Sequence, residues 1–262
     1  VLPGVDFNST ANPIFPLTVY FKEDGAVTGT SYDPAEKVIH LMYDSTSALP
    51  DFHIADEADS VYHEFGHALQ HAMNETVLES PVASFLDLYP YNRDLDSVLE
   101  ALADFYAAAV ARDDAILPYL SANFPSLLAA NSRTGTQYKR SMQNNLVFPD
   151  AYVRNAHLDG RVVAATLNDF RKLLSGDTLR IPAGCTTCTQ FKLSAANIVD
   201  KGTAYDRVLS LAYSAYEGLN TKSTFFHYAT LLGDECAATA WCAAAEVTDA
   251  LATVLDSRGV KP

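Results

Sequence analysis

Two histidines and a glutamate in one short stretch are the residues whose spacing implies chemistry most directly. Residues 63 to 67 read HEFGH, so His63 and His67 are four residues apart and Glu64 lies between them. Residues four apart lie on one face of a helix, so the two imidazoles can bind the same zinc ion. Glu64 then stands beside the ion, where a carboxylate can take a proton from a bound water. This HExxH pattern is typical of zinc metalloproteases.

The segment around the motif has the features of a helix, which we predict over about 56–73. Asp56, Glu57 and Asp59 put negative charge in the first turn, where the helix dipole favours it. Apolar residues recur through the segment with the period of a helix. His71 continues the histidine stripe, but three ligands from one straight helix cannot surround a tetrahedral ion. We therefore expect His71 to be a helix-end or supporting residue rather than a ligand.

A catalytic zinc site needs a third protein ligand, and a second helical stretch offers one. Glu100 and Asp104 are four residues apart in a mostly apolar segment, so both lie on the same helix face. A buried carboxylate needs a partner, which a metal ion or a histidine can supply. We predict that Glu100 is the third ligand and that Asp104 accepts a hydrogen bond from the ring of His63. Weaker candidates for the third ligand are Glu79 and Asp87.

The chain resembles a known family of zinc enzymes at these residues and beyond them. HEFGHALQ followed by ExxxD on a second helix resembles the gluzincins, specifically the thermolysin-like and fungalysin-like endopeptidases. Further similar segments follow the family's order and cover most of the chain from about Thr28. They are the strand pair over 32–43, the RSM segment over 140–142, the H-x-x-G segment over 157–160 and the closing helix over 246–260.

The resemblance implies a role for several individual residues. Zinc bound by His63, His67 and Glu100 would activate a water, with Glu64 as general base and then general acid. His157 and Tyr91 would stabilise the oxyanion of the attacked peptide carbonyl, with Tyr89 as the alternative to Tyr91. Arg140 would bind a substrate carbonyl, and the first strand over 32–43 would hold an extended substrate. Asp150 is the nearest candidate to orient His157.

The same resemblance implies the fold, an α+β two-lobed protease. We expect residues 1–75 to form a small N-terminal β lobe that ends in the HExxH helix, and residues 76–262 to form a mainly helical lobe. The residue patterns agree, since 17–21 alternates and 38–43 is a short apolar run, as strands require. Further helices are predicted at about 95–112, 159–175, 204–217, 222–232 and 245–257.

Composition limits the classes of partner and location. The 262 residues carry a net charge of −14, which argues against binding to nucleic acid or to an acidic membrane. No run of 18 apolar residues occurs, so no membrane span is expected. We expect a secreted or cell-surface monomer that acts on a protein or peptide. Calcium is a second candidate cofactor, with Asp94/Asp96 and Asp113/Asp114 as candidate ligands, although neither pair has an EF-hand pattern.

The four cysteines agree with an extracellular protein. Their even number suggests two disulfides, and we prefer the local pairs Cys185–Cys188 and Cys236–Cys242, with the other two connectivities left open. The alternative is a structural zinc ion bound by all four thiolates.

Two other functions stay open. One is a catalytically inactive zinc-binding or adhesion module, against which the intact Glu64 argues. The other is a zinc exopeptidase, which would need a site for the free amine of its substrate. The sequence contains no strand motif of the GxMEN kind that would supply such a site.

Overall fold

The computed structural model describes residues 17–22, 30–42, 58–74, 93–115, 141–180 and 190–260. This part of the chain is mixed α/β, with one small sheet, a two-stranded ribbon and six helices, as an α+β fold requires. The strands of the sheet are β1 (Thr18–Lys22), β2 (Thr30–Asp33) and β3 (Val38–Met42), and those of the ribbon are β4 (Leu179–Arg180) and β5 (Gln190–Phe191). The helices are α1 (Ala58–Met73), α3 (Arg93–Ala111), α6 (Ala156–Leu174), α7 (Lys201–Glu217), α8 (Phe225–Ala238) and α9 (Ala245–Ser257), and a short 3₁₀ turn, η2 (Ala195–Asn197), precedes α7.

The three-stranded sheet has the order β1-β3-β2, so β3 is central. β1 runs parallel to β3, whereas β2 is antiparallel to it and forms a hairpin with it. Asp33 closes that hairpin, because its Oδ1 accepts the backbone N–H groups of Ala35 and Glu36. β2 is therefore an edge strand of the sheet as described.

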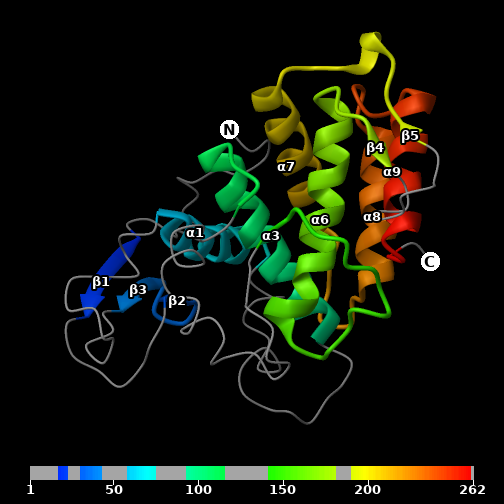
Figure 1. Cartoon of the computed structure of the whole chain (residues 1–262). Helices are drawn as coiled ribbons and strands as arrows, with labels where there is room; N and C mark the ends of the chain where they lie inside the picture. Colours follow the sequence, from blue (N-terminus) through cyan, green and yellow to red (C-terminus); the bar gives the residue numbers. More distant parts are fainter. Residues whose placement is uncertain are drawn as a thin grey trace.

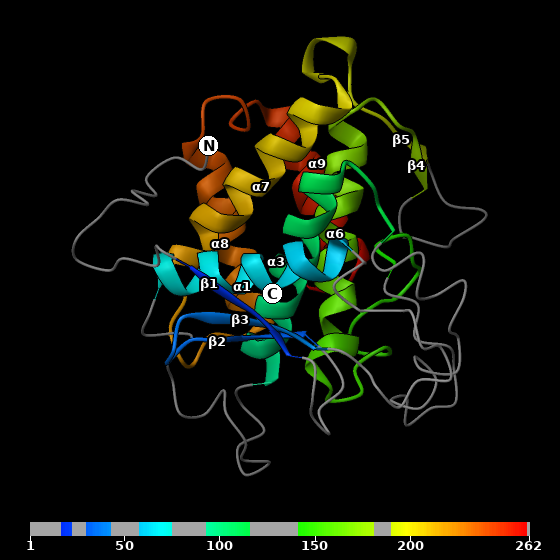
Figure 2. The ribbon, with the colours of Figure 1, turned by 90° about the vertical axis from the view of Figure 1, so that its left-hand side faces the viewer.

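Helix α1 lies between this sheet and the other helices (Figure 1). It packs against β2 and β3 on one side and against α3 on the other. Figure 2 views the molecule from the side of the sheet, with α1 running across α3. Residues of α1 are therefore enclosed by two different layers, and this explains why polar side chains such as His63 and Glu64 are buried.

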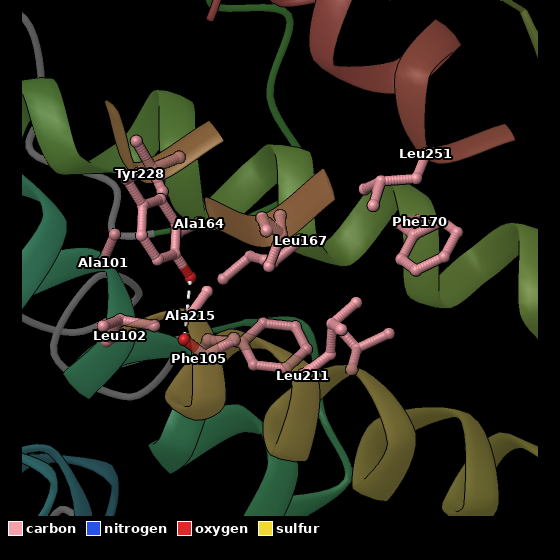
Figure 3. Packing of buried hydrophobic residues seen from close by; sticks show 14 of the residues in the cluster. Ala101, Leu102, Phe105, Ala164, Leu167, Phe170, Leu211, Ala215, Tyr228 and Leu251 are labelled. Carbon is pink, nitrogen blue, oxygen red and sulfur yellow. Dashed lines mark hydrogen bonds between the residues drawn. The ribbon is translucent and has the colours of Figure 1, made fainter. Parts of the chain in front are cut away.

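Helix α3 is the centre of the helical part, since it packs most extensively against α6 and α1 and also contacts α7 and α8. The core between these helices is apolar and closely packed. Figure 3 shows Phe105 of α3, Leu167 of α6 and Leu211 of α7 within one cluster, each of them almost fully buried. Truncating such a side chain typically costs about 2–5 kcal/mol, so this core fixes the relative positions of α3, α6 and α7.

Three helices differ from their predicted ranges by three residues or more at one or both ends. α7 begins at Lys201 rather than 204, since the side chain of Asp200 accepts the N–H of Thr203. α6 begins at Ala156 rather than 159, since the side chain of Asn155 accepts the N–H of Leu158. His157 therefore lies inside the first turn of α6. α8 begins at Phe225, capped by Thr224, and continues through Gly233 to Ala238 instead of ending at 232.

A buried ion pair fastens the last helix to α6. Arg258, at the end of α9, is 1% exposed, and its guanidinium lies 2.6 Å from Oδ2 of Asp169 in α6. The same guanidinium donates to the carbonyl of Leu146, and the backbone oxygen of Arg258 accepts the N–H of Phe148. Leaving one member of a buried pair without its partner typically costs about 3–5 kcal/mol, so this contact anchors the end of the chain as described.

Among the described residues, none of the helices is both long and apolar enough to span a membrane. The boundary between lobes at residues 75 and 76 stays a prediction.

Candidate metal centre

A close approach of two helices brings the third candidate ligand to the HExxH motif. Gly66 lies between His63 and His67 on α1, and a Cβ atom at this position would lie 2.9 Å from the Cα of Ala103 on α3. Real side chains essentially never approach a backbone atom so closely, so glycine is required here. The contact places Glu100, one turn before Ala103, opposite the two histidines.

His63, His67 and Glu100 converge on one point. The two Nε2 atoms lie 3.1 Å apart, and Oε2 of Glu100 lies 3.3 Å from Nε2 of His63. Oε1 of Glu100 lies 3.6 Å from Nε2 of His67. Ligand atoms about 2.0–2.1 Å from a tetrahedral zinc ion are about 3.3–3.4 Å from one another. The separations in this group therefore fit three ligands of one such ion, and these are the residues predicted from the sequence.

The pKa of the Glu100 carboxyl is lowered although its side chain is largely enclosed. Burial alone raises the pKa of the Glu100 carboxyl, because it disfavours the charged form. The charge of His157 and the rings of the two α1 histidines beside the carboxylate outweigh that effect and hold the pKa of Glu100 well below its usual range. The group thus offers an anionic oxygen and two imidazole nitrogens, a donor set that zinc favours.

Asp104 lies where the sequence predicted it, beside His63. Its Oδ1 is 2.8 Å from Nδ1 of His63, and both side chains are about 5% exposed. A carboxylate at this nitrogen favours the tautomer with the proton on Nδ1, which leaves the Nε2 lone pair for a metal. Asp104 is therefore placed to orient the first histidine.

Gln70 is in the equivalent position for His67, and its role was not predicted from the sequence. Its Oε1 lies 3.1 Å from Nδ1 of His67, and its Nε2 donates to the carbonyl of Leu99 on α3. The spacing of three residues from His67 puts Gln70 on the same helix face and was the available signal. His71 is no part of this group, since its Nδ1 lies 2.8 Å from the hydroxyl of Tyr32 on β2.

Glu64 is buried next to His63, and a residue of the sheet donates a hydrogen bond to it. The hydroxyl of Thr30, on the edge strand β2, donates to Oε1 of Glu64 at 2.8 Å. Thr30 was not singled out from the sequence, because the two residues are 34 positions apart. This hydrogen bond fixes the orientation of the carboxylate and leaves it further lone pairs for a proton from water.

His157 reaches the same carboxylate from the third helix. Its Nε2 lies 3.3 Å from Oε2 of Glu100, and its side chain is 52% exposed. His157 is not one of the three converging candidate ligands. It therefore stands at the rim of the site, where a polar group can face a substrate.

Two other predicted site residues, Tyr91 and Arg140, lie outside the described residues, as do Tyr89, Glu79 and Asp87. The segment that follows Arg140 is described, and it is held firmly. Ser141 forms a β-bridge with Ala115, and Asp114 accepts the N–H of Met142 through its backbone oxygen.

The carboxylate of Asp114 is saturated by side chains, which removes one candidate calcium site. It accepts hydrogen bonds from Arg171, Tyr205 and Gln143. Its oxygens are therefore committed to an internal network rather than to a cation. Asp94, in the other candidate pair, accepts the hydroxyl of Tyr152.

A second group of possible metal ligands lies on the hairpin, formed by Asp33, Glu36 and His40. Unlike the first group, it contains no buried side chain. Oδ1 of Asp33 already accepts two backbone N–H groups, and His40 stacks on Tyr20. Asp33 therefore has a role in the turn, and the ring of His40 has a role in packing against Tyr20.

The C-terminal cysteines form the local disulfide Cys236–Cys242, the pairing preferred from the sequence. This disulfide excludes the alternative of a zinc ion bound by all four thiolates, because two of the thiols are consumed. Cys185 and Cys188 lie outside the described residues.

Comparison with models of known protein families and with curated protein sequences found no match to this chain.

Proposed function

We propose that this chain is a zinc-dependent endopeptidase of the thermolysin-like gluzincin kind. The observation that carries the proposal is the convergence of His63, His67 and Glu100 at ligand-like separations, with Glu64 buried beside them. Three protein ligands from two histidines and a glutamate are the set that leaves a zinc ion one position for water. The resemblance of the flanking segments to the family supports the same activity.

The proposed reaction is hydrolysis of a peptide bond by an activated water. His63, His67 and Glu100 would hold a zinc ion, and the bound ion would act as a Lewis acid that lowers the pKa of a water toward neutrality. Glu64 would take the proton of the attacking water and then pass it to the leaving amine. His157 and Tyr91 donate hydrogen bonds to the oxyanion that develops on the peptide carbonyl, and each such donor is worth on the order of 100-fold in rate.

An extended peptide is the proposed substrate, and the edge strand β2 is its proposed docking site. β2 ends the sheet as described and packs against α1, so a peptide paired with it would pass beside Glu64. Thr30 and Tyr32 fasten this strand to α1 through Glu64 and His71. Arg140 would then bind a substrate carbonyl beyond the scissile bond.

The disulfide Cys236–Cys242 supports a secreted or cell-surface location, because disulfides persist in oxidising compartments. We propose that the protein acts there as a monomer, with calcium as an additional candidate cofactor.

The proposal is tested with wild type and Glu64→Gln, assayed on unfolded casein and on a quenched peptide library, with the zinc content of both measured by mass spectrometry. We expect about one zinc per chain in both and cleavage by the wild type alone, since the neutral amide of the variant cannot take a proton. Internal cleavage sites separate an endopeptidase from an exopeptidase, which trims residues only from an end. Zinc in both proteins with cleavage by neither would favour the inactive zinc-binding module instead.

A further inference from the structure

Gln70 is fully buried, and two contacts of its side-chain amide bear on the metal site. Nε2 donates to the carbonyl of Leu99 at 2.8 Å, and Oε1 lies 3.1 Å from Nδ1 of His67. A carbonyl oxygen only accepts hydrogen bonds, so the contact with Leu99 fixes which end of the amide is the nitrogen. The amide oxygen therefore faces His67, and Nδ1 of His67 must be the donor.

This contact settles the tautomer of His67 when the ring is neutral. With the proton on Nδ1, the lone pair lies on Nε2, the atom that faces His63 and Glu100. Asp104 favours the same tautomer of His63, since its carboxylate lies beside Nδ1 of that ring. The two histidines thus present the same nitrogen toward one point, but one is held by a carboxylate and the other by a neutral amide.

The second contact of Gln70 reaches the other helix of the site. Leu99 directly precedes Glu100, so the amide of Gln70 joins the ring of His67 on α1 to the backbone beside Glu100 on α3. A single side chain therefore fixes both the orientation of one candidate ligand and its position relative to another.

We propose that Gln70 is a positioning residue of the metal site, which holds His67 in its metal-binding tautomer and sets its position relative to Glu100. This inference rests on the proposed function only in requiring that the site binds zinc, and it assigns to Gln70 no contact with substrate. Outer partners of metal-bound histidines are typically worth about 10–100-fold in metal affinity.

Comparing the zinc affinity of Gln70→Leu with that of a matched control variant separates a positioning role from a merely structural one. Tyr216→Phe is that control, because the Tyr216 hydroxyl donates a buried hydrogen bond to the backbone oxygen of the same residue, Gln70. Tyr216→Phe loses a buried hydrogen bond at the same place in α1, whereas Gln70→Leu loses the donor to Leu99 and the acceptor of His67. Gln70→Glu is a third variant, which keeps that acceptor and loses the donor to Leu99.

The zinc dissociation constant of each protein is measured at pH 7 by competition with a chromophoric chelator, beside the thermal midpoint of its metal-free form. We expect roughly 10–100-fold weaker binding for Gln70→Leu, a smaller loss for Gln70→Glu and less than about twofold change for Tyr216→Phe. Wild-type affinity in Gln70→Leu, or an equal loss in Tyr216→Phe, would overturn the inference while leaving the proposed function intact. Failure of the wild type to bind zinc would overturn both.

A measurement on the metal-free wild type keeps the inference testable even if Gln70→Leu does not fold. Long-range ¹H–¹⁵N spectra distinguish the two tautomers of each histidine at a pH where the rings are neutral. The contact with Gln70 predicts that His67 carries its proton on Nδ1. A His67 ring protonated on Nε2 instead would contradict the inference directly.

Discussion

A Cβ atom on Gly160 of α6 would lie 2.6 Å from the carbonyl oxygen of Ser97 on α3. The same atom would lie 3.3 Å from the Cβ of Glu100, so the two helices meet at the third candidate ligand. His157 is three residues before Gly160 and contacts the Glu100 carboxylate. The absence of a side chain at Gly160 is therefore what lets α6 bring His157 to the site.

Gly160→Ala is expected to force α6 away from α3, because the obstructing atom is a backbone oxygen that cannot rotate aside. Overpacking of this kind typically costs about 1–3 kcal/mol, and we expect a loss of that size in urea unfolding. Gly233→Ala is the control, since no atom lies within 4 Å of a Cβ at that position in α8. Alanine there should stabilise the helix by about 0.5–1 kcal/mol. Equal effects of the two substitutions would contradict the close approach at Gly160.

Asp104→Asn is expected to weaken zinc binding by at least about tenfold, because the charge opposite Nδ1 of His63 is lost. Asp94→Asn is the matched control. It removes a carboxylate from the first turn of the same helix, where Asp94 accepts the hydroxyl of Tyr152. Zinc titration of both variants measures the difference, and equal affinities would show that Asp104 does not orient the histidine.

Thr30→Val is expected to lower kcat/KM while leaving the zinc content unchanged, since valine keeps the shape of threonine but cannot donate to Glu64. A hydrogen bond to a charged group is worth about 1.5–3 kcal/mol, so the loss should be about tenfold or more. Thr30→Ser restores the donor and should recover most of the activity. A serine variant as impaired as the valine variant would mean that Thr30 acts through packing.

The lowered pKa of Asp114 leads us to expect that the free energy of unfolding falls in acid. Burial raises the pKa of its carboxyl, but the hydrogen bond from Tyr205 and the charge of Arg171 outweigh this and lower the pKa from its ordinary value of 3.8. The folded state therefore binds fewer protons at this group than the unfolded state, and stability falls as pH decreases through the lowered pKa. The stabilisation is fully present above the unfolded-state pKa of about 3.9.

Urea unfolding of wild type and Asp114→Asn at pH 7 and pH 3 measures this contribution. We expect the variant to be less stable by about 3–5 kcal/mol at pH 7, because the buried guanidinium of Arg171 loses its charged partner. The difference should narrow toward pH 3, because the Asp114 carboxyl of the unfolded wild type takes up protons there before that of the folded state does. The exposed residue Asp177 provides the control substitution Asp177→Asn, which should show little effect. A gap that is constant with pH would contradict the lowered pKa of Asp114.

The sequence was sufficient to predict the parts of the site that depend on local patterns. Helical period and spacing predicted α1, α3 and the shared face of His63 and His67, because spacing within a helix follows from its geometry. Glu100 was proposed as a ligand from its place on an apolar helix, where a buried carboxylate needs a partner. The strands β1 and β3 were also predicted, within one residue at each end.

Two supporting residues, Gln70 and Thr30, were not predicted, because each has a partner that is distant in the sequence. The contact of Gln70 with His67 is local, but its second contact is with Leu99 on another helix, and Thr30 contacts Glu64 from a distant strand. The parallel pairing of β1 with β3 was not predicted either, because the two strands are not neighbours in the sequence. The extension of α8 through Gly233 was missed because glycine weakens a helix, whereas burial of Cys236 beyond it supports the added turn.

The identity of the metal-binding residues is the central claim, and the two groups of possible ligands allow a decisive comparison. Zinc is titrated into the metal-free wild type, into Glu100→Gln and into Glu36→Gln, whose substituted residue belongs to the hairpin group. We predict one tight site per chain in the wild type, the same site in Glu36→Gln and loss of tight binding in Glu100→Gln. Tight binding that survives Glu100→Gln and disappears in Glu36→Gln would place the metal on the hairpin and contradict that claim.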